Sequence, residues 1–507
     1  MKHIHAFILL LAGIASACYE DKGTYDYSPI LETALASPIH DTIITRGQHL
    51  TIVPDLKLLE LGNEDQYSEL DPGDYSYEWR AYGKNLNDMS SVLLATTRAL
   101  DTTIYLSTRT EPYRVVYSVT RESTGITRKF QFQLTVTSRY STGWLYLTEE
   151  DDGTAELIVM GTETATNEIV FERDVIERSG FPYRGGGAKF VYWYSNFSRI
   201  IIGTGEATGY IDRVNFEWND TKLVRYMMSM PLPVDHTFEK ILFPSASSAM
   251  HWVDSRGNIM PMQATVGVMY PSYNILPPAV TGTNKYDTVQ VAPFVAGAAS
   301  SSTGQLVYDT KNKRMMRYTG MQSALKTNLE TVAVANQLPN HQIFYMQVYN
   351  VSPTPSVVIA KNLADGKYYR YVYSAITLQA NPEEILNGQL LEQAKYMECD
   401  YVHGFFYMAI GNKLYVFRTN NDGTGELKEV SIVPADASAA ITLDEVTYMG
   451  RYTTITATRE QILVGTYAGT KGSGKIYHLK PTSTEPTVMT AEQIIGSLDR
   501  VKSVSRF

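Results

Sequence analysis

The stretch that decides the fold of this chain reads DGKYYRYVY, residues 365–373. A turn of Asp, Gly and Lys comes first, and a run of aromatic and β-branched residues follows it. Residues of these types favour a tight hairpin turn and then a β-strand. The stretch GNKLYVF, residues 411–417, has the same order of turn and strand. The sequence therefore predicts β-hairpins in this part of the chain.

The same hairpin pattern recurs from residue 143 onwards, without strict repetition of the sequence. In each instance an apolar strand leads into a turn rich in Gly, Asn, Asp or Lys, and a strand carrying aromatic residues follows. The seven turns are Asp152-Gly153, Thr208-Gly209, Arg256-Gly257-Asn258, Lys311-Asn312-Lys313, Asp365-Gly366-Lys367, Gly411-Asn412-Lys413 and Gly472-Ser473-Gly474-Lys475. They lie roughly 45–60 residues apart, slightly more than the repeat of a four-stranded propeller blade.

Seven hairpins at this spacing predict an all-β chain in which residues 143–507 form a seven-bladed β-propeller. Each blade has an apolar face that only a neighbouring blade covers, so a closed ring protects them all. The alternating tail at residues 500–507 is expected to add a strand that ties the last blade to the first. Two consecutive β-sandwiches are the alternative fold. Helical patterns are weak and allow only a turn or two, at residues 382–386 and 491–495.

Residues 28–138 are predicted to form a separate β-sandwich. After the turn at residues 71–74, the run Tyr75-Ser76-Tyr77-Glu78-Trp79 alternates inward and outward side chains. A Tyr-x-Trp strand of this kind resembles the central strand of PKD and other immunoglobulin-like domains, in which the Trp packs between the sheets. A platform for a ligand is the alternative role of Trp79. We expect this domain to be a spacer.

Residues 1–17 have the pattern of a secretory signal peptide. Lys2 supplies the positive charge, and the apolar run at residues 6–14 is too short to span a bilayer. The ending Ala15-Ser16-Ala17-Cys18 resembles a lipobox, which implies cleavage between Ala17 and Cys18 and a lipid on the Cys18 thiol. Acyl chains such as palmitate would then hold the protein at a membrane. An ordinary signal peptide with an incidental Cys is the alternative.

Residues 18–27, CYEDKGTYDY, are polar and without period, which is typical of a tether. The charged residues Glu20, Asp21 and Lys22 resemble the surface-export signal of Bacteroidota lipoproteins. The whole run resembles the start of the PKD-like family of lipoproteins from that phylum. The resemblance implies an outer-membrane lipoprotein that faces the cell exterior beside a nutrient importer of the starch-utilisation (Sus) type. A lipoprotein that faces the periplasm is the alternative.

Composition argues against a nucleic-acid partner. The net charge is −9 and the pI is about 5.6, so no basic surface is expected. The two cysteines, Cys18 and Cys399, are too few for a disulfide framework and lack the spacing of a metal site. Cys399 lies in a strand-like run and is expected to be a buried small residue.

Motifs that imitate catalytic or metal sites fail in detail, so we expect no cofactor, no metal and no catalysis. The glycine-rich stretch at residues 469–475 resembles a phosphate-binding loop, but Ile476 follows its Lys where Ser or Thr is required. Residues 420–426 offer oxygen ligands without the full calcium-loop pattern. The acidic run at residues 149–152 lies at a hairpin tip, whereas glycoside hydrolysis needs carboxylates across a cleft.

The loop from Tyr183 to Lys189 is the most site-like segment. Its three consecutive glycines permit unusual backbone conformations, and Tyr183, Arg184 and the following Trp193 offer stacking and charged donors. These three are the candidate ligand-binding residues; a mobile loop and a core strand are the alternative. The sequence thus predicts a non-catalytic surface lipoprotein that binds glycan or peptide for a Sus-type importer. A propeller-based glycoside hydrolase or lyase, and a structural scaffold of the importer, are the alternatives.

Overall fold

A computed structural model describes the chain between residues 31 and 507, in segments 31–60, 63–68, 70–83, 91–108, 111–164, 166–229, 236–242, 249–263, 267–269, 275–276, 287–296, 305–318, 329–348, 355–374, 376–400, 405–419, 423–436, 439–453, 460–481 and 486–507. The contacts divide the chain into two compact units, which meet in sequence between Thr137 and Ser138. No helix in the described segments is long and apolar enough to cross a membrane.

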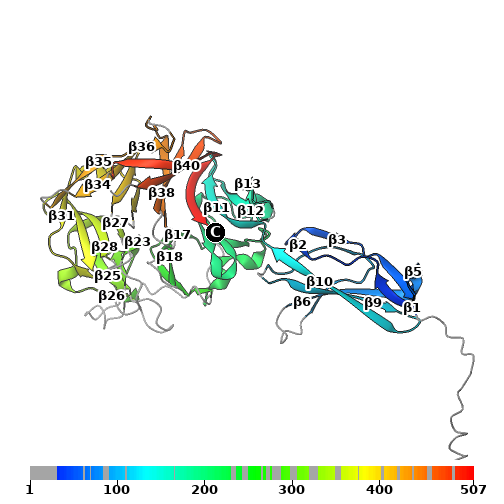
Figure 1. Ribbon diagram of the computed structural model, residues 1–507. Helices are drawn as coiled ribbons and strands as arrows, with labels where there is room; N and C mark the ends of the chain where they lie inside the picture. The colour runs from blue at the N-terminus through cyan, green and yellow to red at the C-terminus, as the bar shows by residue number, and fades with distance from the viewer. Residues whose placement is uncertain are drawn as a thin grey trace, which may run out of the picture. The chain divides into compact units, whose positions relative to one another are not determined.

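The first unit is an immunoglobulin-like β-sandwich (Figure 1). One sheet has five strands in the order β2-β10-β9-β6-β7, and the order β1-β4-β5 and the pair β3-β8 make up the rest. The strands are β1 Leu31–Leu35, β2 Thr42–Thr45, β3 His49–Ile52, β4 Leu56–Glu60, β5 Asn63–Ser68, β6 Tyr75–Tyr82, β7 Ser91–Ala95, β8 Leu100–Thr103, β9 Tyr113–Arg121 and β10 Ile126–Thr137.

Trp79 is the centre of the sandwich, which confirms the prediction that it packs in the core. Its side chain is completely buried. The indole ring stacks on Tyr117 at 4.0 Å between ring centroids, and its Nε1 donates a 2.9 Å hydrogen bond to the Thr97 carbonyl. Apolar side chains from all three sheets meet around it in one cluster. Trp79 therefore has no face left for a ligand.

The second unit is built from small, mainly antiparallel sheets, most of them four-stranded, arranged in a ring (Figure 1). Seven such blades lie in the described residues, two of them joined into one nine-stranded sheet by the parallel pair β31 and β35. Blade 1 contains β41 Arg500–Arg506, β11 Tyr140–Glu149, β12 Ala155–Glu163 and β13 Ile169–Glu172. Blade 2 contains β14 Ala188–Tyr194, β15 Arg199–Thr204 and β16 Thr208–Asp212. Blade 3 contains β17 Phe238–Leu242, β18 Ala249–Asp254, β19 Ile259–Gln263 and β20 Val268–Met269.

Blades 4 to 7 complete the ring. Blade 4 contains β23 Val291–Ala296, β24 Gln305–Asp309, β25 Arg314–Tyr318 and β26 Leu329–Thr331, and blade 5 contains β27 His341–Val348, β28 Pro355–Asn362, β29 Tyr368–Ser374, β30 Thr377–Leu378 and β31 Glu383–Leu386. Blade 6 contains β32 Tyr396–Cys399, β33 Phe406–Ile410, β34 Lys413–Thr419 and β35 Thr424–Glu429. Blade 7 contains β37 Glu445–Thr453, β38 Glu460–Tyr467, β39 Gly474–Pro481 and β40 Val488–Leu498, with β36 Ser431–Pro434 at its outer edge. A small two-stranded sheet, β21 Ile275–Leu276 with β22 Asp287–Thr288, lies outside the blades.

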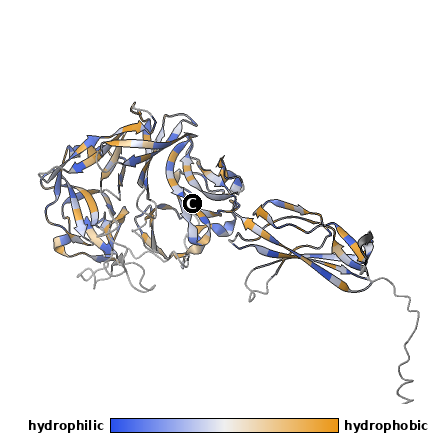
Figure 2. Ribbon diagram, in the orientation of Figure 1, coloured by the Kyte–Doolittle hydropathy of each residue, from blue (hydrophilic) through white to orange (hydrophobic). Residues whose placement is uncertain are grey.

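The innermost strands close the circle. In order around the ring they are β41, β14, β17, β23, β27, β32 and β37, and each contacts the next, with β37 contacting β41 again. Within the part of this unit that the structure describes, buried apolar side chains form seven clusters, each shared by two adjacent blades. Strands such as β24 and β28 are buried along most of their length, because each blade has a neighbour on both faces. Figure 2 shows apolar residues on the strands all around the ring. The unit is a seven-bladed β-propeller, as the hairpin pattern predicted.

The seven predicted hairpins are the connections between the second and third strands of the seven blades. One prediction is displaced, because the turn of blade 2 lies between Thr204 and Thr208, and Thr208 already begins β16. The glycine-rich stretch at residues 469–475 joins β38 to β39 as a hairpin turn, as predicted.

The last strand closes the ring inside the first blade. β41 pairs with β11 in antiparallel register, and Gly143 and Phe507 exchange two backbone hydrogen bonds of 3.0 and 2.9 Å. This confirms the role predicted for the tail. The seam joins segments more than 300 residues apart in sequence.

The two weak helical predictions were wrong. Residues 383–386 form β31 and residues 488–498 form β40, because partner strands on both sides satisfy their backbone groups. The α-helix in the described residues is α2, Val175–Ser179, and the remaining helical turns are short 3₁₀ segments: η1 Pro72–Asp74, η2 Ser195–Phe197, η3 Asp220–Lys222, η4 Val224–Met227, η5 Val334–Asn336 and η6 Gly388–Gln393.

Candidate functional site

A cavity of about 550 Å³ lies among the innermost strands of the propeller. Its walls come from β17, β23, β27, β32 and β37, five of the seven strands that surround the ring axis, together with residues just before β32. Volumes of this size accommodate a ligand of small-molecule dimensions. We call this space the channel cavity.

Backbone irregularities shape the wall of the channel cavity. In six of the described blades the register between the innermost and second strands shifts by one residue, or by two at β23; the innermost strands concerned are β14, β17, β23, β27, β37 and β41. Such β-bulges bend a strand and turn the following side chain to a new direction. Lys240 follows the shift in β17, and Tyr345 follows the shift in β27; both line the cavity.

Glu398 on β32 is the acidic group of the cavity wall. Its side chain is only 14% exposed, and its Oε1 accepts a 3.2 Å hydrogen bond from the Tyr345 hydroxyl. The Arg451 Nε lies 4.0 Å from the same oxygen. Burial raises the pKa of Glu398, while the positive charges of Arg451 and Lys240 act in the opposite direction.

Three cationic side chains line the cavity, and they differ in their partners. Lys395 forms an ion pair with Glu445 at 2.8 Å, and Arg451 lies beside Glu398. Within the described segments, no carboxylate oxygen lies within 4 Å of the Lys240 ammonium group. The wall therefore has an excess of positive charge, with Lys240 its most available cation.

Aromatic rings complete the wall. Phe294, Phe344 and Tyr396 line the cavity and are half-buried, so each ring keeps an accessible part. Gln347 adds an amide whose Oε1 accepts a 3.0 Å hydrogen bond from the Tyr345 hydroxyl. Convergent charged and amide groups between aromatic surfaces are typical of a small-ligand site.

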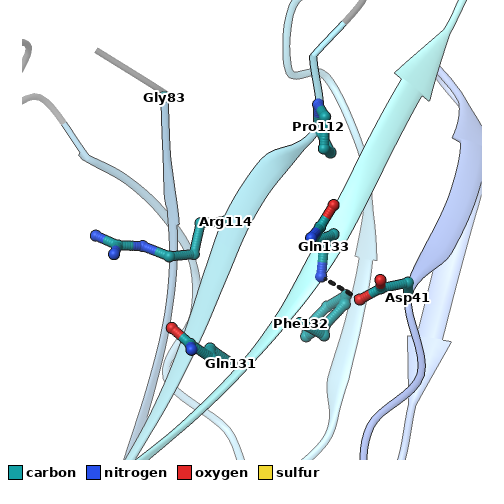
Figure 3. A pocket seen from close by; sticks show the side chains of 7 residues that line it. All are labelled: Asp41, Gly83, Pro112, Arg114, Gln131, Phe132 and Gln133. Carbon is teal, nitrogen blue, oxygen red and sulfur yellow. Dashed lines mark hydrogen bonds between the residues drawn. The ribbon is translucent and has the colours of Figure 1, made fainter. Parts of the chain in front are cut away.

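A second cavity, of about 570 Å³, lies in the sandwich (Figure 3). Asp41 and Arg114 line it, but Figure 3 shows the Arg114 guanidinium group pointing away from Asp41. Asp41 Oδ1 already accepts a 2.7 Å hydrogen bond from the Gln133 backbone N–H. Phe132, another lining residue, is a core side chain. The polar groups of this second cavity do not converge, so we assign it no site.

The glycine-rich loop predicted as a site packs between blades 1 and 2. Gly186 and Gly187 have φ of 74° and 88°, and a Cβ atom on Gly186 would lie 2.9 Å from the backbone of Gly205. Backbone N–H groups of the loop donate to the carboxylates of Glu149 and Glu206 and to the Gly153 carbonyl. The amides of the loop are thus used within the fold.

The structure places the three candidate ligand-binding residues in that neighbourhood without bringing them to either cavity. Tyr183 is half-buried and packs edge-on against Phe181 and Trp218. Trp193 is half-buried on β14, with the Arg213 guanidinium carbon 5.0 Å from its ring centroid.

Arg184 belongs to an acidic cluster beside α2. Its guanidinium group pairs with Glu156 at 3.0 Å and with Glu177 at 3.4 Å. Carboxylates of Glu156, Asp174 and Glu177 lie within 4.8 Å of one another, a spacing that a cation can bridge. Because Arg184 already forms ion pairs with two of them, the cluster is explained as an ion-pair network.

Other predicted residues fall into three groups. Ala17, Cys18, Glu20, Asp21 and Lys22 lie outside the described residues, as do residues 420–422. Cys399 is buried, as predicted, and burial raises the pKa of its thiol well above the ordinary range. The acidic run at residues 149–152 ends β11 at a hairpin, where Glu149 pairs with Arg500 and Lys502.

The residues of the channel cavity were missed by sequence reasoning. Lys240, Glu398 and Arg451 stand far apart in the sequence and match no motif. One usable pattern exists, since each is a charged residue inside the first strand of a blade, next to residues that the fold buries.

Residues 18–180 match the model of the PKD-like family. No curated protein matches.

Solved structures resemble the chain at low identity. A quinonprotein alcohol dehydrogenase-like protein from Bacteroides thetaiotaomicron has a TM-score of 0.37 at 12% identity, over 92% of this chain and 99% of that one. A Synechocystis apocarotenoid oxygenase variant has a TM-score of 0.40 at 9% identity, over 72% and 91%. Saccharomyces cerevisiae Sqt1 has a TM-score of 0.37 at 10% identity, over 63% and 77%. Similarity at this level carries no information on function.

Proposed function

We propose that this protein is a lipid-anchored binding protein of the outer-membrane surface, which captures a glycan or peptide ligand in the channel cavity of its propeller. The observation that carries the proposal is the convergence of charged, amide and aromatic side chains from five innermost strands on one cavity. Rigid strands hold these groups in place, so binding costs little ordering of the protein. The sandwich acts as a spacer between anchor and propeller.

Binding without catalysis is favoured by the chemistry of the wall. Glycoside hydrolysis generally uses two carboxyl groups that face each other across the scissile bond. Among the residues that line the channel cavity, Glu398 is the carboxylate, and Lys395, Lys240 and Arg451 are cations. A hydrolase or lyase is the alternative, and incubation with host and plant polysaccharides would reveal it by released sugars.

The anchor is supported by the N-terminal sequence. The family match begins at Cys18, the residue that the lipobox resemblance makes the first of the mature chain. Metabolic labelling with radioactive palmitate tests this part: label is expected in the wild type and absent in Cys18→Ala. Protease treatment of intact cells is expected to degrade the protein, whereas a protected protein would indicate a periplasmic orientation.

Partnership with a Sus-type importer is the third part of the proposal, and it is supported by the resemblance of residues 18–27. Purification of the native complex from outer membranes is expected to yield importer subunits. Failure to find any would leave a binding protein that works alone. A glycan and peptide array in which nothing binds would instead favour a purely structural scaffold.

A further inference from the structure

The charges of the channel cavity indicate which ligand it accepts. Of the three cations in its wall, Lys395 is neutralised by Glu445, and Arg451 lies at 4.0 Å from the carboxylate of Glu398. Lys240 lines the cavity without a carboxylate within 4 Å in the described residues. The wall thus presents one positive charge more than its own acidic group balances, and a ligand with a negative charge would restore the balance.

The remaining groups suit a sugar ring. A pyranose has apolar C–H faces that pack on aromatic rings, and the half-buried Phe294, Phe344 and Tyr396 supply such surfaces. Its hydroxyls both donate and accept hydrogen bonds, which matches the carboxylate of Glu398 and the amide of Gln347. A sugar therefore uses every kind of group in the wall.

An extended peptide fits this wall less well. Peptides that add to a sheet need a regular row of backbone donors and acceptors on an open strand edge. The register shifts in six innermost strands interrupt that row along the channel. A cavity of about 550 Å³ also accepts a short oligosaccharide segment rather than a long extended chain.

We infer that the channel cavity binds an acidic sugar, a uronate or sialate unit, with its carboxylate held by Lys240 and Arg451. The aromatic rings pack against the sugar faces, and Glu398 and Gln347 bond its hydroxyls. This inference rests on the proposed binding function and narrows it to a ligand class.

Calorimetric titration of the purified mature chain tests the inference. The ligands are short oligosaccharides of galacturonate, glucuronate and sialic acid, each paired with its carboxyl-reduced form, which has the same rings and no charge. We expect at least one acidic ligand to bind about tenfold more tightly than its reduced partner, a difference of about 1.4 kcal/mol, because only the acidic ligand forms a charge-assisted hydrogen bond. Added salt is expected to narrow that difference.

Matched variants locate the effect. Lys240→Met keeps the aliphatic stem of the side chain and is expected to reduce the affinity for the acidic ligand to that for its reduced partner. Arg451→Gln is the second variant, and melting temperatures show whether both fold. Lys413→Met is the control, because Lys413 pairs with Glu429 on blade 6 and does not line the channel cavity; it is expected to bind as the wild type does.

Four results would overturn the inference. Equal binding of acidic and reduced ligands, or an unchanged preference in Lys240→Met, removes the role of the charge. Binding of peptides or neutral glycans alone, abolished by a bulky Gln347→Trp substitution in the cavity, would leave the proposed function standing and the acidic-sugar inference wrong. Binding of no ligand class at millimolar concentration would defeat both.

Discussion

The sandwich and the propeller are both built of mostly antiparallel strands, but they bury their apolar side chains differently. The sandwich has one core cluster around Trp79. The described residues of the propeller form seven clusters, one between each pair of adjacent blades, and a central wall that is free to carry polar groups. In a ring of separate cores the apolar side chains pack between the blades. The side chains around the axis can therefore be polar and can contact a ligand. In the sandwich the polar groups of the cavity beside Asp41 do not converge, so that domain offers no comparable place.

The largest expected effect comes from opening the ring. Removing residues 500–507 deletes β41, the innermost strand of blade 1, and exposes the apolar cluster that blades 1 and 7 share. We expect the propeller to lose its cooperative thermal transition while the sandwich keeps its own, since its core is separate. Differential scanning calorimetry measures both transitions.

Removing residues 19–26, which lie outside the described segments, is the control for the shortened chain and is expected to leave both transitions in place. A chain without β41 that melts at the full-length temperature would show that the ring holds without its seam.

Trp79→Ala and Trp252→Ala compare the two kinds of core directly. Both side chains are completely buried, and each loss is expected to cost about 3–5 kcal/mol. A given loss lowers the melting temperature in inverse proportion to the unfolding entropy, which grows with the size of the unit. We therefore expect a decrease of about 15–20 °C for the sandwich and about 5 °C for the propeller. Equal decreases would mean that the propeller unfolds in smaller pieces than the whole ring.

Acid should weaken the propeller before the sandwich. Burial lowers the pKa of His251 and of His478, each to about 4, and both side chains lie between blades. In the unfolded chain both histidines have the ordinary pKa of about 6.5, so below that pH they bind protons that they do not bind in the folded chain. Stability is therefore fully present above pH 6.5 and declines as the pH falls towards 4, by up to about 3 kcal/mol per residue.

Urea unfolding between pH 4 and 7 measures this loss. His251→Phe is expected to flatten the pH dependence of the propeller transition by about half. A variant with the wild-type slope would assign the acid sensitivity to other groups.

The smallest expected effect concerns the close packing of blades 1 and 2. Gly186→Ala places a Cβ atom 2.9 Å from the backbone of Gly205 at a φ of 74°, and we expect a loss of about 1–3 kcal/mol. Gly366→Ala is the matched control, because its φ is 73° but no atom lies within 4 Å of the added Cβ. Urea unfolding measures the free energy of unfolding of both variants, and the difference between them gives the cost of the close contact with Gly205. Equal losses would mean that backbone strain alone accounts for the effect.

The sequence predicted the fold well because the signals of a propeller are local. Turns such as Asp365-Gly366-Lys367 and the alternating strands after them are fixed by neighbouring residues, and their number gave the number of blades. The two failures at residues 383–386 and 491–495 have a different cause. There, pairing with distant strands overrides a short helical pattern.

The candidate site was harder to predict for a physical reason. Lys240, Glu398 and Arg451 meet because each lies on the innermost strand of its blade. Their spacing in the sequence does not show that these strands surround the same axis. The loop at residues 183–189 was predicted to be a ligand site because of its glycines. In the structure these glycines lie where two blades approach too closely for a larger residue. Glycine reports a backbone requirement and does not say whether a ligand or another blade imposes it.

The reciprocal hydrogen bonds between Gly143 and Phe507 have a consequence for engineering. Because the first and last segments of the propeller are partners, the circle has no privileged starting blade. A linker between these two positions, together with a new break at the turn of Gly411 and Asn412, would give a circular permutant of the propeller without the sandwich, with every sheet of the ring retained. The graft point for a label or a second protein could then be moved to blade 6 without disturbing the axis.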